Sequence, residues 1–332
     1  MKRILIILLT MLFMSSCAKG TAVQTGYDNM NLQMTTLPIC GDMEKVYYVG
    51  YDSGYMIDIN DKKEEHIIEK DGEHSIFDIA LTKNGILYNS VGFNDYTICE
   101  RDVNGDISKK FTISQQNVAW TGKDFIYAEE DNIYYFAFGD RVLYYFNNGE
   151  QEDVLNNVTA VCIGADYIYY GDGDGNICIT DKQFSNTEVL WNKTQLESDS
   201  TTSEFYKTTN STDMIIKDVS VVGDTIRFIW GNAEPMGSGM LIELNTDGEY
   251  RVNNSIRVES YQYYKDNIIF SGYSLIENER VHGIFLKEKD NVRLLKELPV
   301  RRVWGTYVYA NKLYYGYNDY SNATIVLDSI EL

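Results

Sequence analysis

Residues 165–170 read Ala-Asp-Tyr-Ile-Tyr-Tyr, a turn followed by an aliphatic residue and two tyrosines, and this phrase decides the fold. Related phrases recur along the chain, with the cores Val46-Tyr47-Tyr48, Ile86-Leu87-Tyr88, Ile126-Tyr127, Ile168-Tyr169-Tyr170, Ile226-Arg227-Phe228, Ile268-Ile269-Phe270 and Leu313-Tyr314-Tyr315. The first residues of successive cores are separated by 40, 40, 42, 58, 42 and 45 positions. A recurrence of β-forming residues at about forty positions is typical of four-stranded propeller blades.

The second repeat shows how four strands fill one unit. Residues 76–81 predict a first strand, 86–90 a second, 97–101 a third and 109–113 a fourth. The Asn104-Gly105 pair between the last two strands is a strong hairpin-turn signal. Applied to the third repeat, the same order predicts a first strand at 118–120 and a second strand at 125–128.

The two ends of the repeat region complement each other. The seventh unit has three expected strands, at 302–309, 312–317 and 323–329, and then the sequence ends at Leu332. Residues 28–35 alternate apolar and polar side chains, which suits a strand that covers the open edge of the last blade. We therefore predict an all-β fold: a seven-bladed β-propeller of four-stranded antiparallel blades, closed by the N-terminal strand. The alternative is that residues 28–35 continue the preceding leash.

The N-terminus has the pattern of an export signal. Lys2 and Arg3 precede the apolar run 4–14, which is too short to span a bilayer comfortably. Met14-Ser15-Ser16-Cys17 then resembles the bacterial lipobox, although Met14 stands where leucine is usual. The resemblance implies a signal peptide at 1–16, a lipid on Cys17, a flexible leash at 17–27 and a propeller at 28–332, held at the outer face of a bacterial cell membrane. An ordinary secretory signal is the alternative.

Charge and composition exclude several classes of partner. The formal net charge of −20 argues against nucleic acid and against an electrostatic grip on anionic lipid. Cys40, Cys99, Cys162 and Cys178 show no paired spacing, so we expect buried thiols rather than disulfides. The three histidines lie in separate segments, and we predict no metal site and no cofactor. We expect a monomer.

The D-x-I-Y-Y phrase, followed by an aliphatic strand and a D/N-G turn, resembles the propeller domain related to the YWTD propellers of low-density lipoprotein receptor-related proteins. That domain recurs in secreted and lipid-anchored proteins of Gram-positive bacteria. The resemblance covers nearly all of the mature chain, but no unit carries Tyr-Trp-Thr-Asp intact. It implies a fold and a compartment, and it implies no reaction.

The candidate binding residues lie in turns between the second and third strands of the repeats, which we call the rim. Ring closure brings these turns to one face, where aromatic rings beside carboxylates suit sugars or cationic groups. The candidates are Tyr51, Asp52, Phe93, Asp95, Glu130, Asp172, Asp174, Tyr317 and Asp319. The alternative is that tight turns simply select glycine, asparagine and aspartate.

Two further features bear on the rim. Residues 172–176 resemble the opening of a calcium loop, but Gln183 occupies the twelfth position where glutamate is needed. The long fourth step places an insertion at about 192–213, rich in serine and threonine, which we expect to overhang the rim.

The function that fits these features is a binding or scaffold module outside the cytoplasm, which meets a protein, a peptide or a cell-wall glycan. No catalytic residues are predicted, because no nucleophile elbow, P-loop or dinucleotide fingerprint occurs. The alternative function is a glycan-cleaving hydrolase of the cell envelope that uses rim carboxylates. A purely structural spacer is a third possibility.

Overall fold

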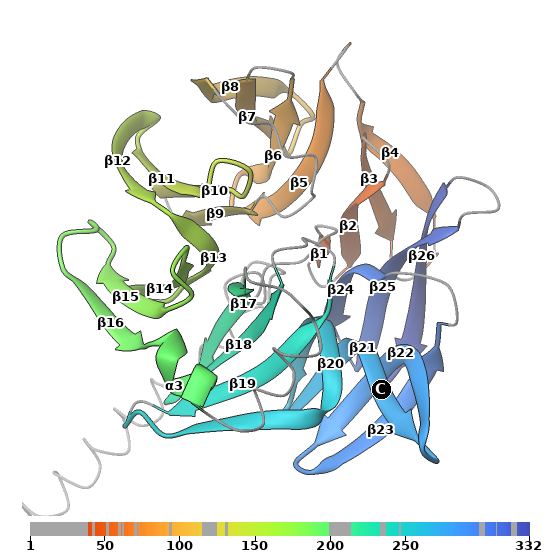
Figure 1. Ribbon diagram of the computed structural model, residues 1–332. Coiled ribbons are helices and arrows are strands. Elements are labelled where there is room, and N and C mark those ends of the chain that lie inside the picture. The colour runs from red at the N-terminus through yellow and green to blue at the C-terminus, as the bar shows by residue number, and fades with distance from the viewer. Residues whose placement is uncertain are drawn as a thin grey trace, which may run out of the picture.

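The computed structural model describes residues 39–41, 44–50, 53–58, 61, 63–69, 72, 74–92, 95–114, 125–129, 132–198, 214–232, 237–245, 247–298, 303–309, 311–319 and 324–332. Antiparallel sheets stand around a common centre, and each begins with its innermost strand (Figure 1). This arrangement is an all-β propeller, as predicted.

The first four sheets have four strands each, paired in sequence order. They comprise β1 (Ile39–Gly41), β2 (Lys45–Gly50), β3 (Ser53–Asp58) and β4 (Glu64–Ile68); β5 (Ser75–Thr82), β6 (Gly85–Val91), β7 (Asp95–Asp102) and β8 (Ile107–Ser114); β9 (Phe125–Glu129), β10 (Asn132–Ala137), β11 (Val142–Asn147) and β12 (Glu150–Asn156); and β13 (Val158–Ile163), β14 (Tyr167–Asp172), β15 (Ile177–Asp181) and β16 (Thr187–Trp191).

A seven-stranded sheet and a three-stranded sheet follow. They comprise β17 (Met214–Val222), β18 (Thr225–Asn232), β19 (Gly239–Asn245), β20 (Tyr250–Tyr264), β21 (Asn267–Ile276), β22 (Glu279–Glu288) and β23 (Asn291–Glu297); and β24 (Val303–Tyr309), β25 (Lys312–Asp319) and β26 (Thr324–Glu331). The seven strands are continuous because β20 is 15 residues long and pairs with β19 through its first part and with β21 through its second.

The core lies between neighbouring sheets rather than in one central mass. Alternate residues of a strand point to opposite faces, so each inner strand contributes to two interfaces. In β9, Ile126 and Ala128 pack against the second sheet, whereas Tyr127 packs against the fourth. Such alternation explains why the repeats are rich in paired large residues.

The first and last sheets meet and close the ring. The Tyr307 hydroxyl in β24 donates a hydrogen bond of 3.0 Å to the Gly41 carbonyl oxygen in β1, across 266 residues of sequence. Tyr307 is 1% exposed, and a Cβ on Gly41 would stand 2.8 Å from the Tyr307 ring. Glycine is therefore needed for this close approach of two inner strands. Residues 28–35, the predicted closing strand, lie outside the described residues.

The structure corrects the third repeat. Its innermost described strand is β9, which packs against β5, the inner strand of the second sheet. The prediction that residues 125–128 form the second strand was therefore wrong, and Ile133-Tyr134-Tyr135 in β10 is the true counterpart of the recurring phrase. Both segments are short aliphatic–aromatic runs after a turn signal, and only packing against the preceding sheet distinguishes them. Residues 118–120 lie outside the described residues.

Four of the five cysteines lie in the described parts of the chain, and all four of these, Cys40, Cys99, Cys162 and Cys178, are buried thiols and not disulfide halves, as predicted. Burial raises the pKa of the Cys162 thiol, which is entirely enclosed, to about 12. Burial, and then the nearby Asp172 carboxylate, raise the pKa of the Cys178 thiol to about 12 as well. Both thiols stay protonated at neutral pH and serve as small apolar core residues.

Candidate functional site

The rim turns share one end of the propeller because every sheet starts at the centre and its strands alternate in direction. The structure describes Asp95, Asp172, Asp174 and Tyr317 among the predicted residues. Asp319 ends β25, but its side chain is not among those described. Tyr51, Asp52, Phe93 and Glu130, together with the proposed lipidation site Cys17, lie outside the described residues.

The third sheet contributes a different turn from the one predicted. Residues 130 and 131 are flanked by β9 and β10, the first and second strands, whereas rim turns join second and third strands. The rim turn of this sheet is 138–141, which carries Asp140. Glu129 agrees with this placement, because it is ion-paired with Lys182 in the β15–β16 turn, on the face opposite the rim.

Asp95 lies in a tight rim turn beside a histidine. The Gly92 amide donates a 2.9 Å hydrogen bond to the Asp95 carbonyl oxygen. The His74 Nε2 atom lies 3.7 Å from Asp95 Oδ1, and its Nδ1 atom lies 3.3 Å from the Ser90 hydroxyl. Both side chains are about one-third exposed, so this carboxylate stands within reach of a ligand.

The carboxylate of Asp172 is occupied by its own turn. Its Oδ1 atom accepts hydrogen bonds from the amides of Asp174, at 2.9 Å, and Asn176, at 2.8 Å. Its Oδ2 atom accepts a third bond of 2.8 Å from the Asn176 side chain. The left-handed φ of +82° at Gly175 completes the turn. The Asp172 carboxylate therefore stabilises its own turn and is not open to a ligand, whereas the Asp174 side chain is exposed.

The insertion begins with a helix that the sequence analysis did not predict. Helix α3 (Lys193–Ser198) follows Asn192, whose side-chain oxygen accepts a 2.9 Å bond from the Thr194 amide and so caps the helix. A Cβ on Gly175 would lie 3.3 Å from the Lys193 side chain. The insertion therefore starts directly against the β14–β15 rim turn, where it was expected; residues 199–213 are outside the described residues.

A basic and aromatic group of side chains at the rim was missed by sequence reasoning. Arg257, Tyr273 and His282 form a row of directly paired residues across β20, β21 and β22. The Arg280 guanidinium lies over the Tyr273 ring, 4.2 Å from its centroid, and the His282 ring centroid lies 4.6 Å from it. We call these four residues the arginine–tyrosine cluster.

The arginine–tyrosine cluster combines two guanidinium groups with a histidine that lies beside the Glu259 carboxylate. Burial, and then the nearby Arg280 charge, lower the pKa of Arg257 from its usual range. Arg257 Nη1 donates a 2.9 Å hydrogen bond to the Ile256 carbonyl oxygen, which holds this guanidinium in place. Arg280 is exposed and Tyr273 is half-buried, so the cluster presents a cation and an aromatic edge to solvent.

Two hydrogen-bonding partners hold the His282 ring of the cluster in place. His282 Nδ1 lies 2.6 Å from the Leu298 carbonyl oxygen, which can only accept, so this nitrogen carries a proton. Its Nε2 atom lies 3.2 Å from the Glu259 carboxylate. Glu259 is the extra residue of a β-bulge in β20, and the same feature recurs at Thr159 in β13 and Lys217 in β17. These bulges turn side chains out of the regular ladder at the rim end of the inner strands.

The charged groups of the rim thus come from separate sheets. Asp95 begins β7, Asp174 lies between β14 and β15, and the arginine–tyrosine cluster spans β20 to β22; Figure 1 shows these strands at separate places around the ring. Tyr317 contributes an aromatic surface: it is stacked on Tyr315 with ring centroids 5.8 Å apart and packs against the core between β20–β23 and β24–β26.

Neither metal-ligand groups nor membrane-spanning helices were found in the described parts of the chain. No three His, Cys, Asp or Glu side chains there are placed to hold a metal ion. No helix there is long and apolar enough to cross a bilayer. What the described rim offers is a set of fixed charges and rings suited to recognition.

Comparison with known proteins shows the fold alone. No family model matches the sequence, and no curated protein matches it either. Among solved structures, the chain is similar to BamB from Moraxella catarrhalis, with 9% identity, 89% of this chain and 97% of that chain covered, and a TM-score of 0.52. It is also similar to the WD40 β-propeller domain of Doa1, with 11% identity and a TM-score of 0.55; the match covers 90% of this chain and 96% of that chain.

Proposed function

We propose that the protein is a lipid-anchored propeller outside the cytoplasm whose rim binds a partner protein or peptide. The observation that carries the proposal is that the rim presents Asp95, Asp174 and the arginine–tyrosine cluster from three separate sheets of one ring. A closed propeller holds these groups rigidly, which reduces the conformational cost of association. Fixed charges of opposite sign also select the orientation of a partner.

The same proposal includes the finer architecture. We infer seven blades, with the seven-stranded sheet counted as two blades that share β20. We also infer that residues 28–35 pair with β26, because a three-stranded last sheet with an open edge is an aggregation hazard. The alternating apolar residues of this segment support that role.

The anchor rests on the sequence. Met14-Ser15-Ser16-Cys17 follows the apolar run at the distance expected of a lipobox. Two acyl chains on one residue anchor a protein stably at a membrane surface without a membrane-spanning segment. Cys17→Ser is expected to release the protein from membranes or leave its precursor uncleaved. Unchanged lipid-labelled mature protein in this variant would refute the anchor.

The binding role is tested by capture of partners from membranes with matched variants. Arg280→Ala removes the exposed cation of the arginine–tyrosine cluster, and Arg293→Ala removes an exposed arginine from β23 of the same sheet. Asp95→Ala removes an accessible carboxylate from another sheet of the rim. We expect Arg280→Ala and Asp95→Ala to lose partners that Arg293→Ala retains. Equal retention by all three variants would show that the rim is not the binding surface.

A further inference from the structure

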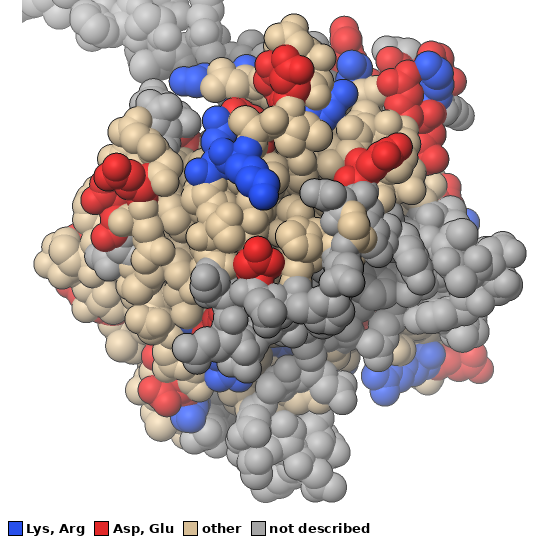
Figure 2. Space-filling view, turned by 90° about the horizontal axis from the view of Figure 1, so that it is seen from above, with Lys and Arg blue, Asp and Glu red and all other residues tan. Residues whose placement is uncertain are grey.

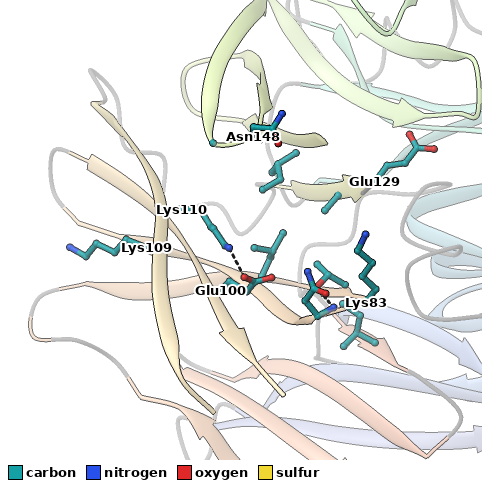
Figure 3. Close-up of a pocket in the computed structure, with 13 residues that line it drawn as sticks. Lys83, Glu100, Lys109, Lys110, Glu129 and Asn148 are labelled. Carbon is teal, nitrogen blue, oxygen red and sulfur yellow. Dashed lines mark hydrogen bonds and ion pairs between the residues drawn. The ribbon is translucent and has the colours of Figure 1, made fainter. Parts of the chain in front are cut away.

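A pocket of about 550 Å³ opens between the second and third sheets, on the face opposite the rim. It lies where the β5–β6 turn of one sheet, which carries Lys83, meets the β11–β12 turn of the next, which carries Asn148 (Figure 3). A volume of this size matches the usual range for small-molecule sites. Nothing in the rim's role depends on this pocket.

The floor of the pocket is apolar and comes from both sheets. Leu81 and Leu87 belong to the second sheet, and Ala128 and Ile133 belong to the third. Leu87 and Ala128 are only 2% and 3% exposed, so this floor continues the core between the sheets. Ile133 is half-buried, and an apolar body of a ligand would cover the part of its side chain that is still open to water.

The two carboxylates around this floor are paired with lysines other than Lys83 and Lys109. Glu100 is paired with Lys110 at 2.5 Å, and Glu129 is held by Lys182 of the fourth sheet. Lys83 in the β5–β6 turn has no ion-pair partner among the described residues. In Figure 3, Lys83 and Lys110 point into the space between the sheets, whereas Lys109 points away from it.

The overall negative charge of the chain acts only weakly on this pocket. Figure 2 shows a patch of lysine and arginine side chains among several separate acidic groups on the molecular surface. At physiological ionic strength, charges more than about 8 Å away are largely screened. The net charge of −20 therefore counts for less at the pocket than the nearby Lys83 ammonium.

We propose that this pocket binds a small organic acid: a molecule with an apolar body and a single negative charge. The apolar body covers the floor formed by Leu81, Leu87, Ala128 and Ile133, and the acid group pairs with Lys83. The Asn84 and Asn148 amides at the mouth supply further hydrogen-bond donors. The site has no groups arranged for chemistry on the ligand, and the proposal is one of binding.

The test uses two dyes of closely similar ring structure. 8-Anilinonaphthalene-1-sulfonate carries one negative charge, and N-phenyl-1-naphthylamine is its neutral counterpart; both fluoresce more strongly in apolar surroundings. Titration of the mature protein is expected to show one saturable site that prefers the anionic dye. Lys83→Gln is expected to lower the affinity for the anionic dye by about tenfold, the usual loss when a hydrogen bond to a charged group is removed. The affinity for the neutral dye is expected to stay the same.

Lys109→Gln is the matched control, since it removes a lysine of the same pocket wall whose charge points away. It is expected to bind both dyes like the unaltered protein. Ala128→Leu fills the floor and is expected to abolish the site for both dyes, with its melting curve measured to confirm folding. Equal affinity of Lys83→Gln, Lys109→Gln and the unaltered protein for the anionic dye would overturn the proposal. So would the absence of a saturable site.

Discussion

Removal of the hydroxyl group at the ring junction is the sharpest test of how the fold is held together. In Tyr307→Phe the ring that packs against Gly41 remains, and the hydrogen bond to the Gly41 carbonyl oxygen is lost. The bond joins the first and last sheets, so it contributes nothing to either sheet alone. Its loss therefore reports on closure.

The magnitude follows from burial. The hydroxyl group and the carbonyl oxygen are both enclosed, and Tyr307 is 1% exposed, so water cannot replace the lost donor. A buried acceptor left without its partner costs roughly 1–3 kcal/mol. We expect the free energy of unfolding to fall by about 2 kcal/mol in Tyr307→Phe.

The assay is urea unfolding followed by tryptophan fluorescence, with Tyr264→Phe as the matched control. The Tyr264 hydroxyl group also joins two neighbouring sheets, through a 3.0 Å bond to Asn311, but this bond is exposed to solvent. Its removal is expected to cost less than about 0.5 kcal/mol, because water takes the place of the lost partner. If Tyr307→Phe is no less stable than Tyr264→Phe, the junction does not hold the ring as described.

Three further predictions concern the core and the turns. The thiols of Cys162 and Cys178 have pKa values raised to about 12. Iodoacetamide at pH 8 is therefore expected to leave both thiols unlabelled in the folded protein and to label both in urea. Labelling of these thiols in the folded protein would contradict their burial. The Tyr261 hydroxyl is fully buried, lies 2.6 Å from the Ser220 hydroxyl and donates a 2.9 Å hydrogen bond to the Arg227 carbonyl oxygen. Tyr261→Phe is therefore expected to lower the free energy of unfolding in urea by about 1–3 kcal/mol. An unchanged unfolding midpoint would show that these hydrogen bonds do not stabilise the fold. Hydrogen bonds from Ser185 lower the pKa of Asp181 from its ordinary value to about 2; because the folded-state pKa is the lower one, the stabilisation is complete above about pH 4 and is lost as the pH falls through 2. A carboxyl NMR titration of Asp181 with a midpoint near 4 would contradict this.

The repeated phrase carried most of the fold because its residues are buried wherever they occur. Val46, Ile168 and Leu313 are each 0% exposed and sit at equivalent places in β2, β14 and β25. The pattern failed in the third repeat, where two similar runs follow each other within a few residues. The local sequence predicts that both runs are strands, but contact with β5 decides which of them lies innermost.

The candidate site was predictable only in part. Turn residues such as Asp95 and Asp172 are visible in sequence, although whether a carboxylate faces a ligand or its own turn depends on local hydrogen bonds. The arginine–tyrosine cluster was missed because its members are brought together by strand register. Arg257 pairs with Tyr273 only after a bulge shifts the pairing of β20 with β21, and no spacing in the sequence marks that shift.

A crystal structure of residues 28–332 would test the central claim most directly. The account predicts seven sheets around one axis, β24 in contact with β1, and residues 28–35 paired with β26 as the outer strand of the last sheet. An open arc of sheets, a different number of blades, or a β26 edge that residues 28–35 do not cover would contradict it.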